Sequence, residues 1–215
     1  MTVLFDLDGT LTDPAEGILG SVAYALRKMG VQPPAHEEMR WVIGPPLQGS
    51  LAKLLRTEDD ARSAECLAFY RERFGEVGLF ENELYEGVPE MLGELRRHGR
   101  RLFVATSKPT VFTNRILDHF EIAGFFDGAY GSELDGRRAD KGELLRYIVG
   151  QEGLDAEGTV MVGDRRHDVE GARANGLPCI GVLYGYGSEA ELREAGAHAL
   201  ADSPASVVKH LSFGV

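Results

Sequence analysis

The chain has 215 residues, of which 43% are hydrophobic and 27% are charged, and its formal net charge is −11. This composition is that of a globular protein large enough to bury a core, either as one domain or as a domain with an insertion. The acidic balance argues against non-specific nucleic-acid binding, which depends on basic faces. A small phosphorylated ligand remains compatible with it, because the local field of a bound cation can oppose the global charge.

No stretch of the sequence approaches the ~18 consecutive apolar residues of a membrane span, and the first residues lack the bases of a signal peptide. The two cysteines, Cys66 and Cys179, lie far apart among apolar residues. We expect two buried free thiols, which suit a reducing compartment. The sequence therefore predicts a cytoplasmic protein that binds neither a membrane nor a nucleic acid polymer, and it leaves the oligomeric state open.

The first β-rich run is Thr2–Phe5, and a long segment without a convincing strand follows it, from about Pro14 to Leu84. A simple crossover between strands needs only about 10–12 residues, so this segment is too long to be one. We predict a helical domain at residues 14–84, inserted into a core made of residues 1–13 and 85–215. Its helical patterns are Ala15–Met29, Leu47–Leu55 and Asp60–Phe74, separated by proline-rich breakers at 31–34 and 44–46.

Beyond the insertion, helical patterns alternate with short apolar runs typical of strands. This alternation predicts an α/β fold with a Rossmann-like, three-layer parallel-sheet core that carries an all-helical cap domain. The expected helices are Val88–His98, Val111–Phe120, Lys141–Gly150 and His167–Ala174. The expected strands are Arg101–Ala105, Asp127–Tyr130, Thr159–Val162 and Cys179–Leu183, with Ala197–Ala201 as a further edge.

Polar residues follow three of these strands. Asp6-Leu7-Asp8-Gly9-Thr10 follows the strand Thr2–Phe5, and Thr106-Ser107-Lys108 follows Arg101–Ala105. Gly163-Asp164 follows Thr159–Val162. Ligands of open α/β sheets bind outside the carboxyl ends of the strands, so these residues are expected to converge on one site.

Up to four carboxylates, those of Asp6, Asp8, Asp164 and Asp168, would gather at this edge of the sheet. They would repel one another unless a cation neutralised them. A set of oxygen ligands without cysteine or histidine favours magnesium over zinc. Each motif alone has a simpler explanation as a turn or a helix cap. Their occurrence together, each at a strand end, favours the functional interpretation.

Lys141 begins a predicted helix, where a cation opposes the helix dipole. It could be an ordinary surface lysine, but an anionic neighbour would remove the conflict. We expect Lys141 to hold the attacking carboxylate and the phosphoryl oxygens, while the Thr106 hydroxyl donates to the phosphate.

These motifs, taken in order, resemble those of the haloacid dehalogenase superfamily of phosphatases. The four motifs correspond to Asp6–Thr10, Thr106, Lys141 and Gly163–Asp168. The resemblance spans nearly the whole chain, and the helical insertion lies where one branch of the superfamily carries its cap. Within the superfamily, the set is most similar to phosphoglycolate phosphatases and related 5′-nucleotidases. Ser107 and Gly142 depart from residues frequent in relatives, and neither departure touches a catalytic group.

The resemblance implies a magnesium-dependent phosphomonoester hydrolase that forms an aspartyl-phosphate on Asp6, with Asp8 as general acid and base. It implies catalytic roles for Asp6, Asp8, Thr106 and Lys141. It also implies a magnesium site formed by Asp6, the Asp8 carbonyl and Asp164, with Asp168 sharing the metal or orienting its water. Substrate-binding residues would be Gly9, Thr106, Ser107, Lys108 and Lys141.

Two other functions fit the same motifs. A phosphoryl-transferring mutase of the β-phosphoglucomutase type would share every motif, and a non-catalytic phosphate-binding module would be expected to have lost a catalytic group. The substrate, a small phosphorylated metabolite, is also undecided. The carboxylate of phosphoglycolate would suit a cation such as Lys53 or Arg56, whereas a nucleoside monophosphate would suit an aromatic such as Trp41 or Phe74. Trp41 itself is expected in the core of the cap.

The segment Gly185-Tyr186-Gly187-Ser188-Glu189-Ala190 matches the dinucleotide-binding pattern G-x-G-x-x-A. The acidic residue required about 20 positions later is missing, and too little chain remains for a complete βαβ unit. We therefore expect a glycine-rich loop beside the active site instead of a nucleotide site.

Overall fold

In the computed structural model, which describes residues 1–212, the chain divides into two compact units. The sheet unit consists of Met1–Asp13 together with the chain from Leu84 onward, and the helical unit is Pro14–Glu83. Two short strands, β2 (Thr12–Asp13) and β3 (Glu83–Leu84), pair with each other where the chain passes between the units. The sequence did not predict these two strands, because two residues carry no periodicity.

The sheet unit contains, within the described residues, one six-stranded sheet in which every neighbouring pair is parallel. The strand order is β5-β4-β1-β6-β7-β8, so the central strand β1 lies between β4 and β6. The predicted α/β fold with a parallel sheet is therefore confirmed. The strands are β1 (Thr2–Phe5), β4 (Arg101–Pro109), β5 (Gly128–Ser132), β6 (Thr159–Gly163), β7 (Cys179–Val182) and β8 (Ala199–Ala201).

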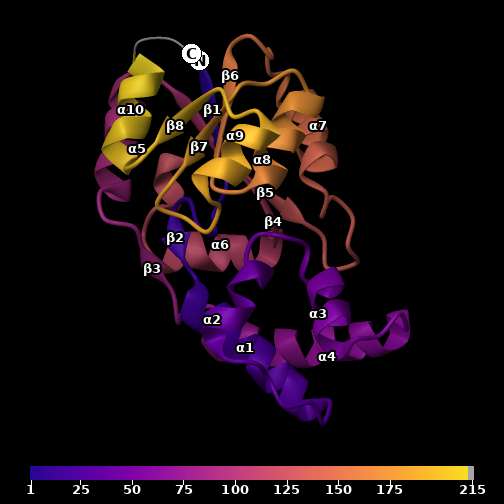
Figure 1. Ribbon diagram of the computed structural model, residues 1–215. Coiled ribbons are helices and arrows are strands. Elements are labelled where there is room, and N and C mark those ends of the chain that lie inside the picture. Colours follow the sequence, from indigo (N-terminus) through magenta and orange to yellow (C-terminus); the bar gives the residue numbers. More distant parts are fainter. Residues whose placement is uncertain (213–215) are drawn as a thin grey trace. The chain divides into compact units, whose positions relative to one another are not determined.

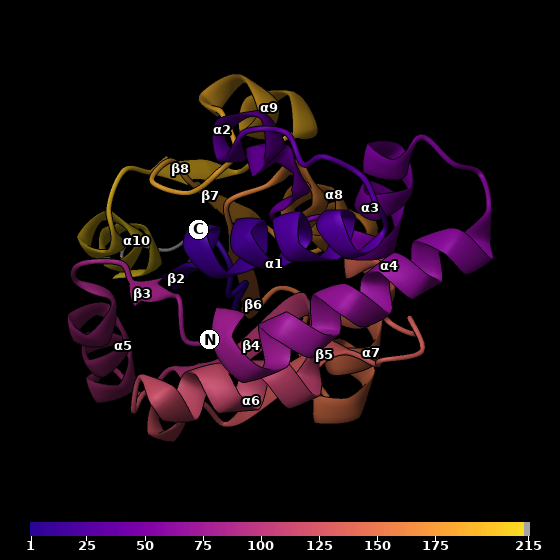
Figure 2. The same ribbon diagram turned by 90° about the horizontal axis from the view of Figure 1, so that it is seen from below.

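Helices cover both faces of this sheet (Figures 1 and 2). One face carries α7 (Lys141–Glu152), α8 (Arg166–Ala174) and α9 (Glu189–Ala195), and the other carries α5 (Val88–Arg97), α6 (Thr110–His119) and α10 (Pro204–Ser212). The core beneath the first set joins apolar strand residues to the inner sides of the helices. Its fully buried members include Leu4, Phe103 and Met161 from strands and Leu144, Val169 and Leu192 from helices.

The spacing of apolar residues explains how the helices pack. In α5, Val88, Met91, Leu92 and Leu95 are buried, and this i, i+3, i+4, i+7 pattern places them on one face. The α7 helix begins after Asp140, whose carboxylate accepts a hydrogen bond of 2.9 Å from the Glu143 backbone N–H. Such capping fixes the first turn, and with it the position of Lys141.

The helical unit contains α1 (Ala15–Lys28), α3 (Leu47–Leu55) and α4 (Asp60–Arg73), close to the predicted bounds. The short α2 (His36–Met39) and the 3₁₀ turn Arg40–Val42 were not predicted. The prediction that α4 includes Phe74 was wrong by one residue, because the chain continues there as a π-helical turn, Phe74–Gly78. Gly17 allows α1 to approach this turn, since a Cβ on Gly17 would lie 1.9 Å from the Gly78 carbonyl oxygen.

Trp41 does not lie in the core of the helical unit, so that prediction was wrong: the residue is 39% exposed. The Lys53 ammonium lies 5.8 Å from the centroid of its ring, a distance typical of a cation–π contact. Phe74, in contrast, is buried and stacks on Tyr70 with a centroid distance of 5.1 Å. Of the two aromatic candidates for a nucleobase, only Trp41 is therefore accessible.

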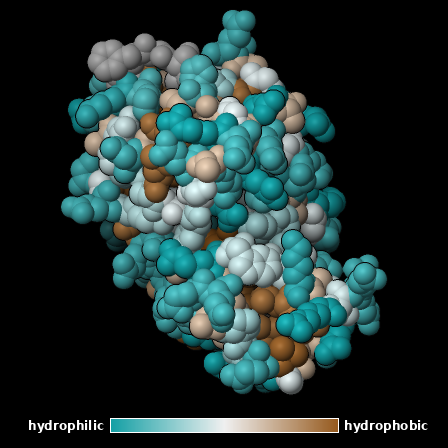
Figure 3. Space-filling view, in the orientation of Figure 1, coloured by the Kyte–Doolittle hydropathy of each residue, from teal (hydrophilic) through white to brown (hydrophobic). Residues whose placement is uncertain are grey.

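Most of the face seen in Figure 3 is hydrophilic, in keeping with the high charge of the sequence, and an apolar patch lies on the helical unit. Among residues 1–212, no helix is both long and apolar enough to cross a bilayer. Cys66 and Cys179 are buried and unbonded to each other, as predicted.

Candidate active site

The candidate site lies at the carboxyl ends of three adjacent strands. Phe5, the last residue of β1, pairs with Val104 of β4 on one side and with Val162 of β6 on the other. The residues that follow are thereby brought together although they are about 100 and 60 positions apart in the chain. The strand order of the sheet reverses at β1. Open α/β sheets commonly bind ligands at the carboxyl ends of the strands at such a point.

The structure extends β4 beyond the predicted end at Ala105, so that Thr106, Ser107 and Lys108 belong to the strand. The register with β5 shifts between Ala105 and Pro109, which marks an irregularity at this point. Bulges of this kind re-aim side chains next to active sites. The polar residues are thus held on a strand and not on a free loop.

Three buried carboxylates form the centre of the site. Asp6, Asp164 and Asp168 each offer an oxygen, and these atoms all lie within 4.8 Å of one another. Asp6 is 4% exposed, and Asp164 and Asp168 are fully buried. Three carboxylates this close and this dry repel one another strongly, so the cluster requires compensating positive charge.

Lys141 supplies one positive charge to this cluster. Its ammonium nitrogen lies 3.1 Å from Asp6 Oδ1 and 2.7 Å from Asp168 Oδ1, and it donates a hydrogen bond of 2.8 Å to the Ala105 carbonyl. These three contacts match the three donors of an ammonium group. Burial alone would lower the pKa of Lys141, but the carboxylates of Asp168 and Asp6 outweigh burial and raise it. The lysine therefore stays charged.

The cluster as a whole still holds more negative than positive charge. Burial raises the pKa of Asp164 well above its ordinary value, and the neighbouring Asp168 and Asp6 raise it further. Burial also raises the pKa of Asp168 to about 6, although Lys141 opposes this effect. Both shifts follow from placing three ionisable acids in a buried cluster that contains one lysine. A hard divalent cation with oxygen ligands fits both the donor atoms and the remaining charge.

Asp8 lies beside a second lysine. Its Oδ1 is 2.9 Å from the Lys108 ammonium, and both residues are less than 10% exposed. Burial raises the pKa of the Asp8 carboxyl, and Lys108 opposes that rise. The sequence analysis assigned Lys108 to substrate binding, but it did not foresee this ion pair.

Gly9 makes the turn after Asp8 possible. Its φ of +83° lies in the left-handed region that favours glycine, and a Cβ there would lie 2.2 Å from Asp164 Oδ2. Both the backbone and the space therefore require glycine at this position.

Thr106 and Ser107 differ in their surroundings. Thr106 is buried, and its hydroxyl oxygen accepts a hydrogen bond of 3.3 Å from the Lys108 backbone N–H. The Ser107 hydroxyl donates to the Ala139 carbonyl at 3.0 Å and so joins β4 to the segment before α7. Since the Ser107 proton is used in this bond, a hydrogen bond donated by Ser107 to a phosphate would have to come from its backbone N–H.

Two of the carboxylates also accept hydrogen bonds from backbone N–H groups. The backbone N–H of Tyr186 donates to Asp164 Oδ2 at 2.8 Å, and that of Arg165 donates to Asp168 Oδ2 at 3.1 Å. The glycine-rich loop that contains Tyr186 is thus beside the site, as the sequence predicted. That its backbone holds Asp164 could not be predicted, because any residue type can supply an N–H.

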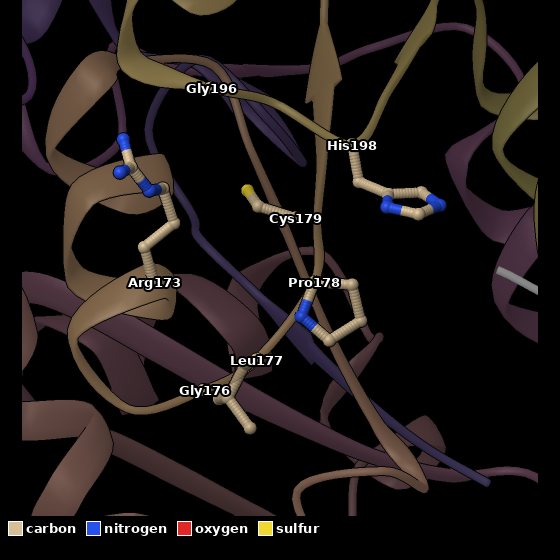
Figure 4. A pocket seen from close by; sticks show the side chains of 7 residues that line it. All are labelled: Arg173, Gly176, Leu177, Pro178, Cys179, Gly196 and His198. Atoms are coloured by element: carbon tan, nitrogen blue, oxygen red, sulfur yellow. The ribbon is translucent and has the colours of Figure 1, made fainter.

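A separate hollow lies at the amino end of β7, around Cys179, the first residue of that strand (Figure 4). Its Arg173 already donates to the Ala195 carbonyl at 2.7 Å, and burial raises the pKa of the Cys179 thiol well above its usual range. Neither residue is therefore prepared for catalysis. The lining residues are Arg173, Gly176, Leu177, Pro178, Cys179, Gly196 and His198.

Comparison with known proteins agrees with the geometry of the carboxylate cluster. Residues 3–182 match the family model described as haloacid dehalogenase-like hydrolase. A solved structure of a predicted phosphatase from Clostridium acetobutylicum superimposes with a TM-score of 0.95 at 42% identity, covering 99% of this chain and 98% of that one.

Three curated relatives carry different names. A 5′-nucleotidase from Pseudomonas aeruginosa is 51% identical over 193 residues, which cover 89% of this chain and 86% of the relative. The tyrosine-protein kinase PtkA of Mycobacterium tuberculosis is 40% identical, and the match covers 86% of this chain but only 62% of that protein. A phosphoglycolate phosphatase from Pseudomonas putida is 31% identical, with 86% and 70% covered.

The contacts of Lys141 lead to a prediction about stability. Lys141→Met should lower the free energy of unfolding of the metal-free protein by about 3–5 kcal/mol, because it leaves Asp6 and Asp168 buried without their cation. Urea unfolding in the presence of a chelator measures this change. Lys209→Met, at an exposed lysine of α10, is the matched control and should change stability little. Equal stability of the two variants would show that Lys141 does not stabilise the cluster.

Proposed function

The chain belongs to the haloacid dehalogenase-like hydrolases, and we propose that within this family it is a magnesium-dependent phosphomonoester hydrolase that forms an aspartyl-phosphate on Asp6. It is a phosphatase of small phosphorylated substrates, in keeping with the phosphatase and nucleotidase names of its relatives. The observation that carries the finer proposal is the buried cluster in which Lys141 holds Asp6 beside Asp164 and Asp168.

Asp6 is the proposed nucleophile. Its Oδ1 accepts a hydrogen bond of 2.8 Å from the Leu7 backbone N–H and faces Lys141 at 3.1 Å. With Oδ1 held in this way, Oδ2 is the oxygen that we expect to attack phosphorus. The attack breaks the bond from phosphorus to the ester oxygen and leaves the phosphoryl group on Asp6. A carboxylate fixed from two sides loses little further freedom when it reacts.

Asp8 is the proposed general acid and base. It lies two residues beyond Asp6, and it would give a proton to the leaving alkoxide and later take one from the water that hydrolyses the aspartyl-phosphate. The Lys108 ammonium, 2.9 Å from Asp8 Oδ1, would orient this carboxyl group between the two steps. Lys108 is thus proposed to position the Asp8 carboxyl group, in addition to any contact that it makes with the phosphate.

The remaining polar groups are proposed to bind the phosphoryl oxygens. Thr106 would donate its hydroxyl, Lys141 its charge and Ser107 its backbone N–H group. Gly9, which the sequence assigned to substrate binding, would instead leave space there, because its N–H already donates to the Thr12 carbonyl at 2.8 Å. In a dry site such donors stabilise the charge that develops on the phosphoryl oxygens, and they are already in place before the reaction.

Magnesium would be held by the Asp6 carboxylate, the Asp8 backbone carbonyl and Asp164. Asp168 would act through water, because its two oxygens already face Lys141 and the Arg165 N–H. When bound, the ion would neutralise and orient the phosphoryl oxygens. The protein supplies fixed, buried carboxylate oxygens, which are the ligands that a hard cation prefers.

For the substrate, we propose a nucleoside monophosphate first and phosphoglycolate second. The relative at 51% identity is named 5′-nucleotidase, whereas the phosphoglycolate phosphatase reported above is 31% identical. In the helical unit the accessible ring of Trp41 could stack on a base, and Lys53 beside it could bind an anion. A mutase on the same scaffold would need the same residues, and hydrolysis of a simple ester separates the two activities.

The nucleophile is tested by Asp6→Asn. The amide keeps the size and the Oδ1 acceptor of the side chain but is a far weaker nucleophile, so kcat should fall by at least about 1,000-fold. The thermal midpoint should remain near that of the wild type. Asp118→Asn, at an exposed position of α6, controls for the loss of one carboxylate charge. Asp6→Asn activity within tenfold of the wild type would rule out Asp6 as the nucleophile.

The substrate and the metal are tested together by a panel of esters. Nucleoside monophosphates, phosphoglycolate, sugar phosphates and p-nitrophenyl phosphate are assayed for phosphate release with Mg²⁺ and with excess chelator. We expect the highest kcat/KM for a nucleoside monophosphate and no turnover after chelation. The Asp6→Asn protein, purified in parallel, measures contaminating phosphatase. Activity that survives chelation would contradict the metal role, and sugar-phosphate isomerisation without phosphate release would favour the mutase.

A further inference from the structure

The loop after β7, which we call the tyrosine loop and define as Gly185–Gly187, packs directly against Asp164. A Cβ on Gly185 would lie 2.4 Å from Asp164 Cβ and 2.2 Å from the Gly9 carbonyl oxygen. A Cβ on Gly187 would lie 2.0 Å from the Asp164 carbonyl oxygen. Distances below 3 Å are not found for real Cβ atoms, so both glycines are required for this approach. Neither glycine has a positive φ, and the requirement is therefore one of space.

The same loop holds the Asp164 carboxylate. The Tyr186 backbone N–H donates to Asp164 Oδ2 at 2.8 Å, while the hydroxyl of Thr10 approaches Oδ1 at the longer distance of 3.5 Å. Since Asp164 is fully buried, the Tyr186 N–H is the stronger of these two restraints on its rotation. Partners that orient a ligating carboxylate commonly affect metal affinity as much as the ligand itself does.

The side chain of Tyr186 anchors the loop at a second point. Its hydroxyl donates to the carboxylate of Asp13, the last residue of β2 and of the sheet unit before the helical insertion. Nearby, the Tyr184 hydroxyl donates to the Thr10 carbonyl at 3.1 Å, and its ring packs edge-to-face on Tyr85 with a centroid distance of 5.1 Å. The tyrosine loop is thus fixed to Asp13, before the insertion, and Tyr184, the residue that precedes the loop, contacts Tyr85 after the insertion.

We propose that Tyr186 is a positioning residue for the metal carboxylate Asp164. Its hydroxyl bond to Asp13 holds the tyrosine loop in place, and its backbone N–H then fixes the orientation of Asp164 Oδ2. The inference rests on the magnesium role proposed above for Asp164. It assigns a function to a side chain that has no role in the catalytic steps or the magnesium site proposed above, and it makes Mg²⁺ affinity depend on Asp13 as well.

The test measures Mg²⁺ affinity directly, by calorimetric titration of the metal-free protein without substrate. Tyr186→Phe and Asp13→Ala each remove the hydroxyl–carboxylate bond and should weaken Mg²⁺ binding by roughly 10-fold, within the range found for outer-shell partners. The double variant should bind no more weakly than either single variant, because both remove the same bond. Asp13→Asn keeps an acceptor oxygen and should bind Mg²⁺ within about threefold of the wild type.

Three further variants provide two controls and a second test of the tyrosine loop. Tyr24→Phe removes a tyrosine–carboxylate hydrogen bond of the same kind, to Glu72 of the helical unit, and should leave Mg²⁺ affinity unchanged. Gly185→Ala places a methyl group against Asp164 and should weaken binding by at least about 10-fold, whereas Gly150→Ala, with open space around it, should not.

The outcomes separate this inference from the proposed function. If the wild type binds Mg²⁺ and hydrolyses esters but Tyr186→Phe and Asp13→Ala bind it equally well, the positioning role is wrong and the proposed function stands. If the wild-type protein binds no Mg²⁺, both proposals fail. If the losses of the two single variants add in the double variant, the residues act independently and the coupling through one bond is contradicted.

Discussion

A cluster of three buried carboxylates, two of which contact the Lys141 ammonium, is the arrangement on which the rest of the site depends. Asp6, Asp164 and Asp168 come from the ends of two strands and the first turn of a helix, and Lys141 comes from the start of another helix. Burying such a group is unfavourable unless each charge has a partner. The parallel sheet provides the rigid frame, and the lysine and backbone N–H groups provide the partners. What remains is an excess of negative charge that suits a divalent cation, and such a cation would in turn attract a phosphoryl group.

The sheet unit and the helical unit carry different parts of the proposed function. Every residue to which we assign a chemical step lies in the sheet unit, on β1, β4, α7, β6 or the segments that follow them. The helical unit contributes the residues considered for substrate choice, of which Trp41 and Lys53 form a pair. The proposed reaction is therefore compatible with relatives named 5′-nucleotidase and phosphoglycolate phosphatase, whose names differ in the substrate.

Much of the fold and of the candidate site could be predicted from the sequence, because both have strong local signals. Apolar runs that end in Asp6, Thr106 and Asp164 identify three strands and one edge of a sheet, and the lack of strands after Pro14 identifies the insertion. The misses have physical reasons. Trp41 follows no helical periodicity that would reveal its exposed side, and the Lys108–Asp8 pair depends on an irregular strand end. The hydrogen bond from Tyr186 to Asp164 uses a backbone N–H, and because every residue except proline has one, the residue type does not predict it.

The central claim is that Asp6 becomes covalently phosphorylated during turnover. Borohydride reduces an aspartyl-phosphate to homoserine, so mixing enzyme, Mg²⁺ and a good substrate, quenching within one turnover and reducing the product marks the reacting residue. Peptide mass spectrometry then locates it. We expect homoserine at position 6 in the wild-type protein and at no position in Asp6→Asn. Rapid phosphate release without homoserine at position 6, or with homoserine at another aspartate, would contradict the account.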